Sequence, residues 1–202
     1  MKQDERYICL DTETTGISVK NKHKIIEIGC VEVVNGKETG RTYHAYLNPD
    51  REIDKEAQAV HGISLDSLQD KPRFQEIADD FTKFIANSTL VIHNATFDLN
   101  FLNYELELCG LEKIENPIVD TLILARKKYV GERASLDALC KKFEVDLSSR
   151  NMHGALLDAG LLAKVFMRMD QEFDINIRKI KYITEDEFIR EPYQDLKFTV
   201  LA

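Results

Sequence analysis

The sequence predicts an α/β fold in which a mixed five-stranded sheet, three antiparallel strands followed by parallel ones, is flanked by helices. Three strand-like segments with short connections fill the first 47 residues, as in an antiparallel meander. From residue 74 onward, segments with the helical period alternate with short apolar strands. We therefore expect one domain over residues 1–169, followed by a charged tail over 170–202.

The three N-terminal strands are predicted from apolar runs and a turn signal. Tyr7–Leu10 is a short apolar run, typical of a buried strand. Lys24–Val34 (KIIEIGCVEVV) alternates apolar and polar residues over its second half, as a half-buried strand does. Asn35-Gly36 is a strong hairpin signal, so Thr39–Leu47 is the expected return strand.

The rest of the chain predicts helices separated by short strands. Phe74–Ala86 has apolar residues at the helical period, and Thr89–Ile92 is a short buried strand. The remaining expected elements are a helix over Phe97–Cys109, a strand at Ile118–Val119, a helix capped by Asp120 and ending at Lys128, a helix capped by Ser135 and ending at Phe143, and a long amphipathic helix over Gly154–Met169.

Composition narrows the set of possible functions. With 44% hydrophobic and 31% charged residues among 202, the chain is typical of a soluble globular protein. No segment has the roughly 18 uninterrupted apolar residues of a membrane span, and the charged start MKQDERY is unlike a signal peptide, so we expect a cytoplasmic protein. A net charge of -8 argues against a broad basic surface for nucleic acid, so any such contact must be local or assisted by metal ions or a partner.

Two carboxylates stand two residues apart in YICLDTETTGI. If the strand continues that far, Asp11 and Glu13 point to the same face of the sheet. Two parallel carboxylates repel each other unless a cation lies between them. Ordinary surface acids at the end of a strand are the alternative interpretation.

Three further features favour a metal site. In LVIHNATFDL, Asp98 falls in the first turn of a helix, where an acid also stabilises the helix dipole. In NMHGALLDA, Asp158 lies among apolar helix residues, and an acid in that setting needs a metal or a base as partner. His153 would lie about 500° around an ideal helix from Asp158, so it can reach the same site only from the segment before the helix.

Four acids and one histidine are the parts needed for two-metal hydrolysis of a phosphodiester. Hard oxygen ligands suit Mg²⁺, and a histidine can take the proton from an attacking water. DTETTG, HNATFD and HGALLDA, in this order, resemble the motifs of the DEDDh 3′–5′ exonucleases over Ile8–Met169. NPDREIDKEAQAVHGI, SLDALCKKF and HGALLDAGLLAKVF resemble in particular the proofreading epsilon subunits of bacterial DNA polymerase III.

The resemblance implies a ribonuclease H-like fold and removal of nucleotides from the 3′ end of single-stranded DNA during replication. It implies that two divalent ions, Mg²⁺ or Mn²⁺, are held by Asp11, Glu13, Asp98 and Asp158. His153 would be the general base, and Glu13 would also help to position the water. The implied substrate-binding residues are Asp11, Glu13, Thr14, Thr15, Gly16, Glu56, His61, Asn94, Phe97 and Asp158.

The resemblance also implies partners: the DNA polymerase III catalytic (alpha) subunit, a sliding clamp and a small theta-like subunit. Gln194–Phe198 (QDLKF) resembles a short clamp-binding peptide, although chance also produces such a match. Two other functions stay open. One is a 3′–5′ exoribonuclease of the oligoribonuclease or ribonuclease T type, because the motif acids do not read the 2′-hydroxyl. The other is a non-catalytic module that binds the polymerase.

Several polar residues are expected to have no part in the site. We expect His23 and His44 to be surface or strand residues without function, and Glu27 and Glu32 to lie on solvent faces or sheet edges. Asp120 is expected to be a helix cap, with a fifth metal ligand as the alternative.

Overall fold

The computed structural model describes residues 5–148 and 152–173 of the chain, and it has the predicted mixed sheet. The strand order is β3-β2-β1-β4-β5, with β1, β2 and β3 antiparallel and β4 and β5 parallel to β1. The strands are β1 (Arg6–Thr14), β2 (Ile25–Val34), β3 (Lys37–Tyr46), β4 (Thr89–Ile92) and β5 (Ile118–Asp120). The α-helices are α1 (Lys55–His61), α2 (Phe74–Ile85), α3 (Ala95–Leu108), α4 (Thr121–Lys128), α5 (Leu136–Lys142) and α6 (Ala155–Phe173). Short 3₁₀ helices span Val19–Asn21 and Leu65–Leu68.

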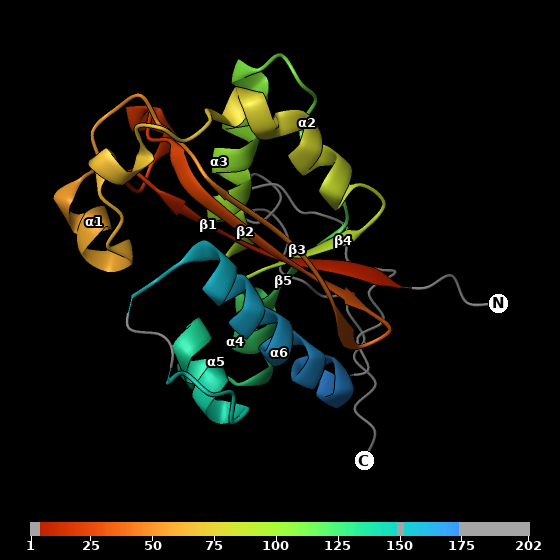
Figure 1. Ribbon diagram of the computed structural model, residues 1–202. Coiled ribbons are helices and arrows are strands. Elements are labelled where there is room, and N and C mark those ends of the chain that lie inside the picture. The colour runs from red at the N-terminus through yellow and green to blue at the C-terminus, as the bar shows by residue number, and fades with distance from the viewer. Residues whose placement is uncertain (1–4, 149–151, 174–202) are drawn as a thin grey trace.

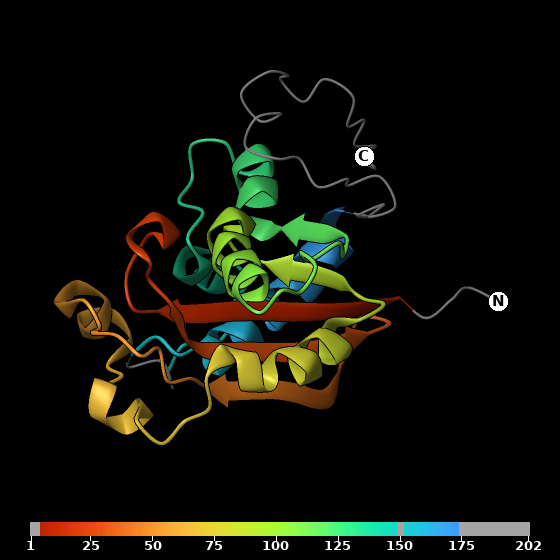
Figure 2. The same ribbon diagram turned by 90° about the horizontal axis from the view of Figure 1, so that it is seen from above.

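The helices cover both faces of the sheet (Figure 1). Helices α2 and α3 lie on one face, and α4, α5 and α6 lie on the other, as the view from above also shows (Figure 2). The side chains of β1 alternate between these two cores. Ile8 and Leu10 pack with residues of α2 and α3, whereas Tyr7 and Cys9 pack with residues of α4, α5 and α6. Strand β1 is therefore buried on both faces, as a central strand must be.

Strand β1 continues four residues beyond the predicted end and reaches Thr14. Its pairing with β2 stays regular through Glu13, and the register shifts only between Glu13 and Thr14. Because alternate residues share a face, Asp11 and Glu13 continue the row of Tyr7 and Cys9 toward α6. Asp11 and Glu13 were expected to point together only if the strand extends through Glu13, and it does.

A glycine allows α6 to approach the sheet closely. Gly29 on β2 lies opposite Asp11 on β1. A Cβ atom at Gly29 would lie 2.2 Å from both the carbonyl carbon of Ala155 and the amide nitrogen of Leu156. The first turn of α6 therefore packs directly on the backbone of β2, and this contact brings Asp158 beside the end of β1.

Helix α1 was not predicted, because its sequence KEAQAVH is short and has no marked amphipathic pattern. It lies beyond the ends of β1 and β2, at one edge of the molecule (Figure 1). The expected boundary at residue 169 falls inside α6, and the predicted tail lies outside the described residues from 174 onward. None of the described helices has the length and apolar character needed to cross a membrane.

Replacing Gly29 with alanine should destabilise the protein, because the new methyl group meets backbone atoms that cannot move independently. We expect a loss of about 1–3 kcal/mol in the free energy of unfolding, the usual scale of overpacking. Gly160, on α6, is the matched control, since a Cβ there meets nothing within 4 Å. Alanine at position 160 should stabilise by about 0.5–1 kcal/mol. Urea denaturation of both variants measures this, and equal stabilities would contradict the packing argument.

Candidate active site

A cavity of about 540 Å³ opens where the end of β1 meets the beginnings of α3, α5 and α6. The residues that line it come from four separate parts of the chain. They are Asp11, Thr12, Glu13, His93, Asn94, Phe97, Asp98, Ser135, Leu136, Asp137, His153 and Asp158. All four predicted metal ligands and the predicted general base are among them.

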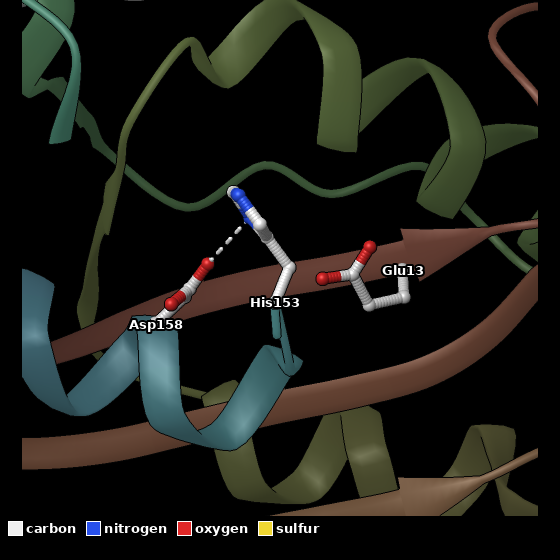
Figure 3. A group of neighbouring side chains, drawn as sticks. All are labelled: Glu13, His153 and Asp158. Carbon is white, nitrogen blue, oxygen red and sulfur yellow. Dashed lines mark ion pairs between the residues drawn. The ribbon is translucent and has the colours of Figure 1, made fainter. Parts of the chain in front are cut away.

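Three of the predicted residues form a close group. Glu13, His153 and Asp158 each offer a ligand atom, and these atoms all lie within 4.8 Å of one another. Nδ1 of His153 is 3.1 Å from Oδ2 of Asp158 (Figure 3). His153 precedes the first residue of α6, Ala155, so it reaches Asp158 from the segment before the helix, as the helix geometry requires.

Asp98, on α3, is held by Thr12, which lies between Asp11 and Glu13 on β1 and points to the opposite face of the sheet. Its Oδ1 accepts hydrogen bonds from the backbone N–H of Thr12 at 3.0 Å and from the Thr12 hydroxyl at 2.8 Å. Asp98 is 3% exposed, and burial raises its pKa to about 7. The bonds from Thr12 oppose that shift, whereas the charge of Asp120 adds to it. Binding a cation would offset this cost of burying the ionised carboxylate.

Asp120 joins the N-termini of two helices. Its side chain accepts hydrogen bonds from Leu122 and Ile123 of α4, as a helix cap does. It also accepts a hydrogen bond of 2.8 Å from the N–H of Ala95, the first residue of α3, and one of 3.3 Å from Asn94. The predicted cap is therefore present. The same carboxylate also fixes the start of the helix that carries Asp98.

The cavity is acidic. Its lining includes five carboxylates, and no lysine or arginine is among the described residues that line it. Like charges at this density repel one another unless cations are present. Oxygen donors from several carboxylates are the ligands that Mg²⁺ and Mn²⁺ prefer. The donor set therefore fits divalent ions of this kind.

The residues predicted to bind substrate fall into two groups. Asn94 and Phe97 line the cavity together with the acids. Thr14, Thr15, Gly16, Glu56 and His61 lie outside its lining, where the end of β1 meets α1. The turn after β1 is joined to the start of α1, because the N–H of Asp54, the residue before α1, donates a 2.9 Å hydrogen bond to the carbonyl of Thr15.

His23 was expected to have no role, but it supports this turn. It is 4% exposed, with Nδ1 3.0 Å from the Thr15 hydroxyl and Nε2 3.3 Å from the carboxylate of Asp54. A Cβ at Gly16 would lie 2.3 Å from the His23 ring, so position 16 requires glycine. The acid that contacts His23 is Asp54, which lies in a distant part of the sequence. Spacing between neighbouring residues therefore does not reveal this contact.

The expectation that Glu27 and Glu32 face solvent is wrong. They are 2% and 3% exposed, and they lie on opposite faces of β2, opposite Glu13 and Ile8 of β1. Glu32 is paired with Arg6 and Arg41, and Glu27 with His44. Strand β2 is central, so covering elements lie over both of its faces, and alternation alone does not reveal this.

Comparison with known proteins agrees with this arrangement. A family model described as an exonuclease (RNase_T) matches residues 8–166. The chain is 53% identical over 168 residues to the DNA polymerase III subunit epsilon of Rickettsia typhi (strain ATCC VR-144 / Wilmington), a match that covers 81% of this chain and 73% of the relative. It is 51% identical over 172 residues to the subunit of the same name from Escherichia coli (strain K12), with 81% and 71% covered.

Solved structures share the fold. Exonuclease X in complex with 5′ overhanging duplex DNA matches with a TM-score of 0.68 and 27% identity, over 87% of this chain and 96% of that one. The nuclease domain of 3′hExo, a DEDDh family member bound to rAMP, matches with a TM-score of 0.72 over 84% and 94% of the two chains. At 19% identity, this second likeness concerns the fold alone.

Replacing Asp120 with alanine should destabilise the protein more than losing an ordinary cap, because two helix N-termini lose their acceptor. We expect a loss of about 2 kcal/mol or more, against about 1 kcal/mol for a single cap. Ser135→Ala is the control, since Ser135 accepts a bond from Ala138 only. Urea denaturation compares the two, and an equal loss would show that the bonds to Asn94 and Ala95 contribute nothing.

Proposed function

Because the chain belongs to the exonuclease family and is a metal-dependent 3′–5′ exonuclease, we propose that it hydrolyses the 3′ ends of single-stranded DNA to nucleoside monophosphates. In this proposal it is the proofreading epsilon subunit of a DNA polymerase III and works in the cytoplasm during replication. The names of relatives about half identical to it support that assignment.

The observation that carries the proposal is the meeting of Glu13, His153 and Asp158 within 4.8 Å in the same acidic cavity as Asp11 and Asp98. The four carboxylates come from β1, α3 and α6, so only the folded chain brings them together. In the proposal these four carboxylates hold two divalent ions, Mg²⁺ or Mn²⁺. Such ions supply an activated water at neutral pH and stabilise the charge that develops on the phosphate.

His153 acts as the general base in this proposal. Its side chain is 47% exposed, so the ring borders solvent while Asp158 orients it through Nδ1. A histidine at such a position can take a proton from water near neutral pH. Glu13 lies beside His153 and helps to orient the same water. Gly154 follows His153, and glycine has a freer backbone than other residues. The segment that carries the histidine can therefore adjust to the 3′ end of a DNA strand.

The 3′-terminal nucleotide would lie between the cavity and α1. Asn94 and Phe97 would form one side of its pocket, and Glu56 and His61 the other. The turn at Thr14, Thr15 and Gly16 connects the two, and the small residue at position 16 lets the chain pass close to a nucleotide. Asn94 has a left-handed backbone with a φ of 71°, a conformation that costs energy and is held by Asp120.

The acidic surface favours a tethered enzyme. A net charge of -8 gives little general attraction for a DNA strand, whereas a polymerase partner supplies frayed ends at high local concentration. The proposed partners are the alpha subunit of DNA polymerase III, a sliding clamp and a small theta-like subunit. The clamp-like peptide at Gln194–Phe198 lies outside the described residues.

The fold alone does not decide between DNA and RNA. A likeness with a TM-score of 0.70 is to a 3′-exonuclease whose structure concerns the recognition of a histone mRNA stem-loop. An exoribonuclease therefore remains the second candidate, and a non-catalytic polymerase-binding module is the third.

The test is hydrolysis of 3′-labelled single-stranded DNA and RNA of matched sequence in the presence of Mg²⁺. We expect DNA to be degraded at least about 10-fold faster, because contacts around the sugar discriminate against the added 2′-hydroxyl. Asp11→Asn should lower the DNA rate by about 10²–10³-fold, the scale of losing one group that stabilises transition-state charge. Asp80→Asn, at an exposed acid on α2, is the control and should match the wild type.

Two outcomes would contradict the proposal. A clear preference for RNA would replace DNA proofreading by exoribonuclease activity. Equal rates for the wild type and Asp11→Asn would remove the catalytic assignment and leave the binding module.

A further inference from the structure

Glu27 is a buried acid that the catalytic scheme above does not use. It is 2% exposed and lies on β2 directly opposite Glu13. Opposite residues of an antiparallel pair point to the same face, so Glu27 faces the active-site side of the sheet. Burying a carboxylate is costly unless its oxygens are hydrogen-bonded.

Only one oxygen of Glu27 has a partner within the described parts of the chain. Oε1 is 2.8 Å from Nε2 of His44 on β3, whereas Oε2 is buried and makes no hydrogen bond there. Tyr46, the cross-strand neighbour of Glu27, has a raised pKa through burial, then through the charge of Glu27 and a side-chain hydrogen bond to it. His44 therefore fixes the carboxylate, and Oε2 is directed elsewhere.

His61 has a buried ring nitrogen that lacks a hydrogen-bond partner of normal geometry among the described residues. It is 5% exposed, and its Nδ1 accepts a 3.0 Å hydrogen bond from the N–H of Ile63. The neutral ring then carries its proton on Nε2, which is also buried and has no hydrogen-bond partner of normal geometry among the described residues. Burial lowers the pKa of His61, a backbone hydrogen bond with Thr14 and the charge of Glu27 raise it, and the charge of His153 lowers it, so both Glu27 and His153 lie within electrostatic range. Oε2 of Glu27 is a hydrogen-bond acceptor, and the protonated Nε2 of His61 is a donor.

The same oxygen of Glu27 also faces the segment that carries His153. A Cβ at Gly154 would lie 3.9 Å from Oε2. The N–H of His153 is 3.3 Å from the carbonyl of Val60, the residue before His61. The end of α1 and the segment before α6 are therefore linked to each other, and the second of these segments lies near Oε2 of Glu27.

We propose that Glu27, oriented by His44, is a positioning residue: Oε2 accepts a hydrogen bond from Nε2 of His61 through one bridging water, and thereby holds His61 and the linked His153 in place. This inference rests on the proposed exonuclease function. In it, Glu27 touches neither the metal ions nor the reacting atoms. It acts on His61, which borders the proposed nucleotide pocket, and through the linked segment on His153.

The experiment compares Glu27→Ala with Glu32→Ala, a buried acid on the same strand but paired with Arg6 and Arg41. Using 3′-labelled single-stranded DNA, we expect Glu27→Ala to lower kcat by about 10–100-fold, as loss of an outer-shell partner does. The affinity for Mn²⁺, measured by calorimetry, should stay within twofold of the wild type. Glu27→Gln keeps an acceptor oxygen and should recover most of the rate. Glu32→Ala should lose stability but keep kcat.

His44 provides a variant that does not remove the buried acid. Its side chain is 33% exposed, so substitution there is compatible with folding. His44→Ala should lower kcat, and His44→Gln, whose amide N–H replaces Nε2 as donor, should restore it. If Glu27→Ala and His44→Ala keep the wild-type kcat, or if Glu32→Ala loses as much as Glu27→Ala, the positioning role is wrong.

A readout without activity separates this inference from the function on which it rests. In the wild type, imidazole NMR should show His61 in the Nε2–H form with a proton that exchanges slowly. In Glu27→Ala that proton should exchange rapidly. An inactive wild type that still shows this difference would overturn the exonuclease function but not the Glu27–His61 contact. An unchanged His61 signal would overturn the contact.

Discussion

The repulsion between carboxylates gathered at the end of β1 is the constraint on which the rest of the structure depends. Asp11, Glu13, Asp98 and Asp158 line one cavity, and burial already raises the pKa of Asp98 to about 7. Without cations, the free energy would fall if these carboxylates moved apart. The surrounding fold must therefore hold the acids together, and the metal ions of the proposed function would offset their repulsion.

Each acid is held by a different element of the scaffold. The pairing of β1 with β2 aligns Asp11 and Glu13, and the missing side chain of Gly29 lets α6 bring Asp158 beside them. Asp98 is fixed by Thr12, a residue of the opposite face of β1, while Asp120 holds the start of its helix. Buried polar contacts of this kind are costly unless complete, so they also select one arrangement of the site.

The sequence predicted the parts that depend on local pattern. The pattern of strands and helices predicted three antiparallel strands followed by parallel ones, and the helix angle between His153 and Asp158 required His153 to lie before α6, where the structure has it. What it could not give were contacts between distant segments: the second role of Asp120 at α3, and the close approach at Gly29. Glu27 and His23 were misjudged for the same reason, because only the packed neighbours show that they are buried.

The most direct measurement is a crystal structure with Mn²⁺ and deoxythymidine 5′-monophosphate, in which anomalous scattering locates the metal. The account predicts two Mn²⁺ ions, about 3.5–4 Å apart, bound by Asp11, Glu13, Asp98 and Asp158, with His153 beside them but not bound to either ion. A single ion held by His153, or ions located away from Asp98, would contradict it.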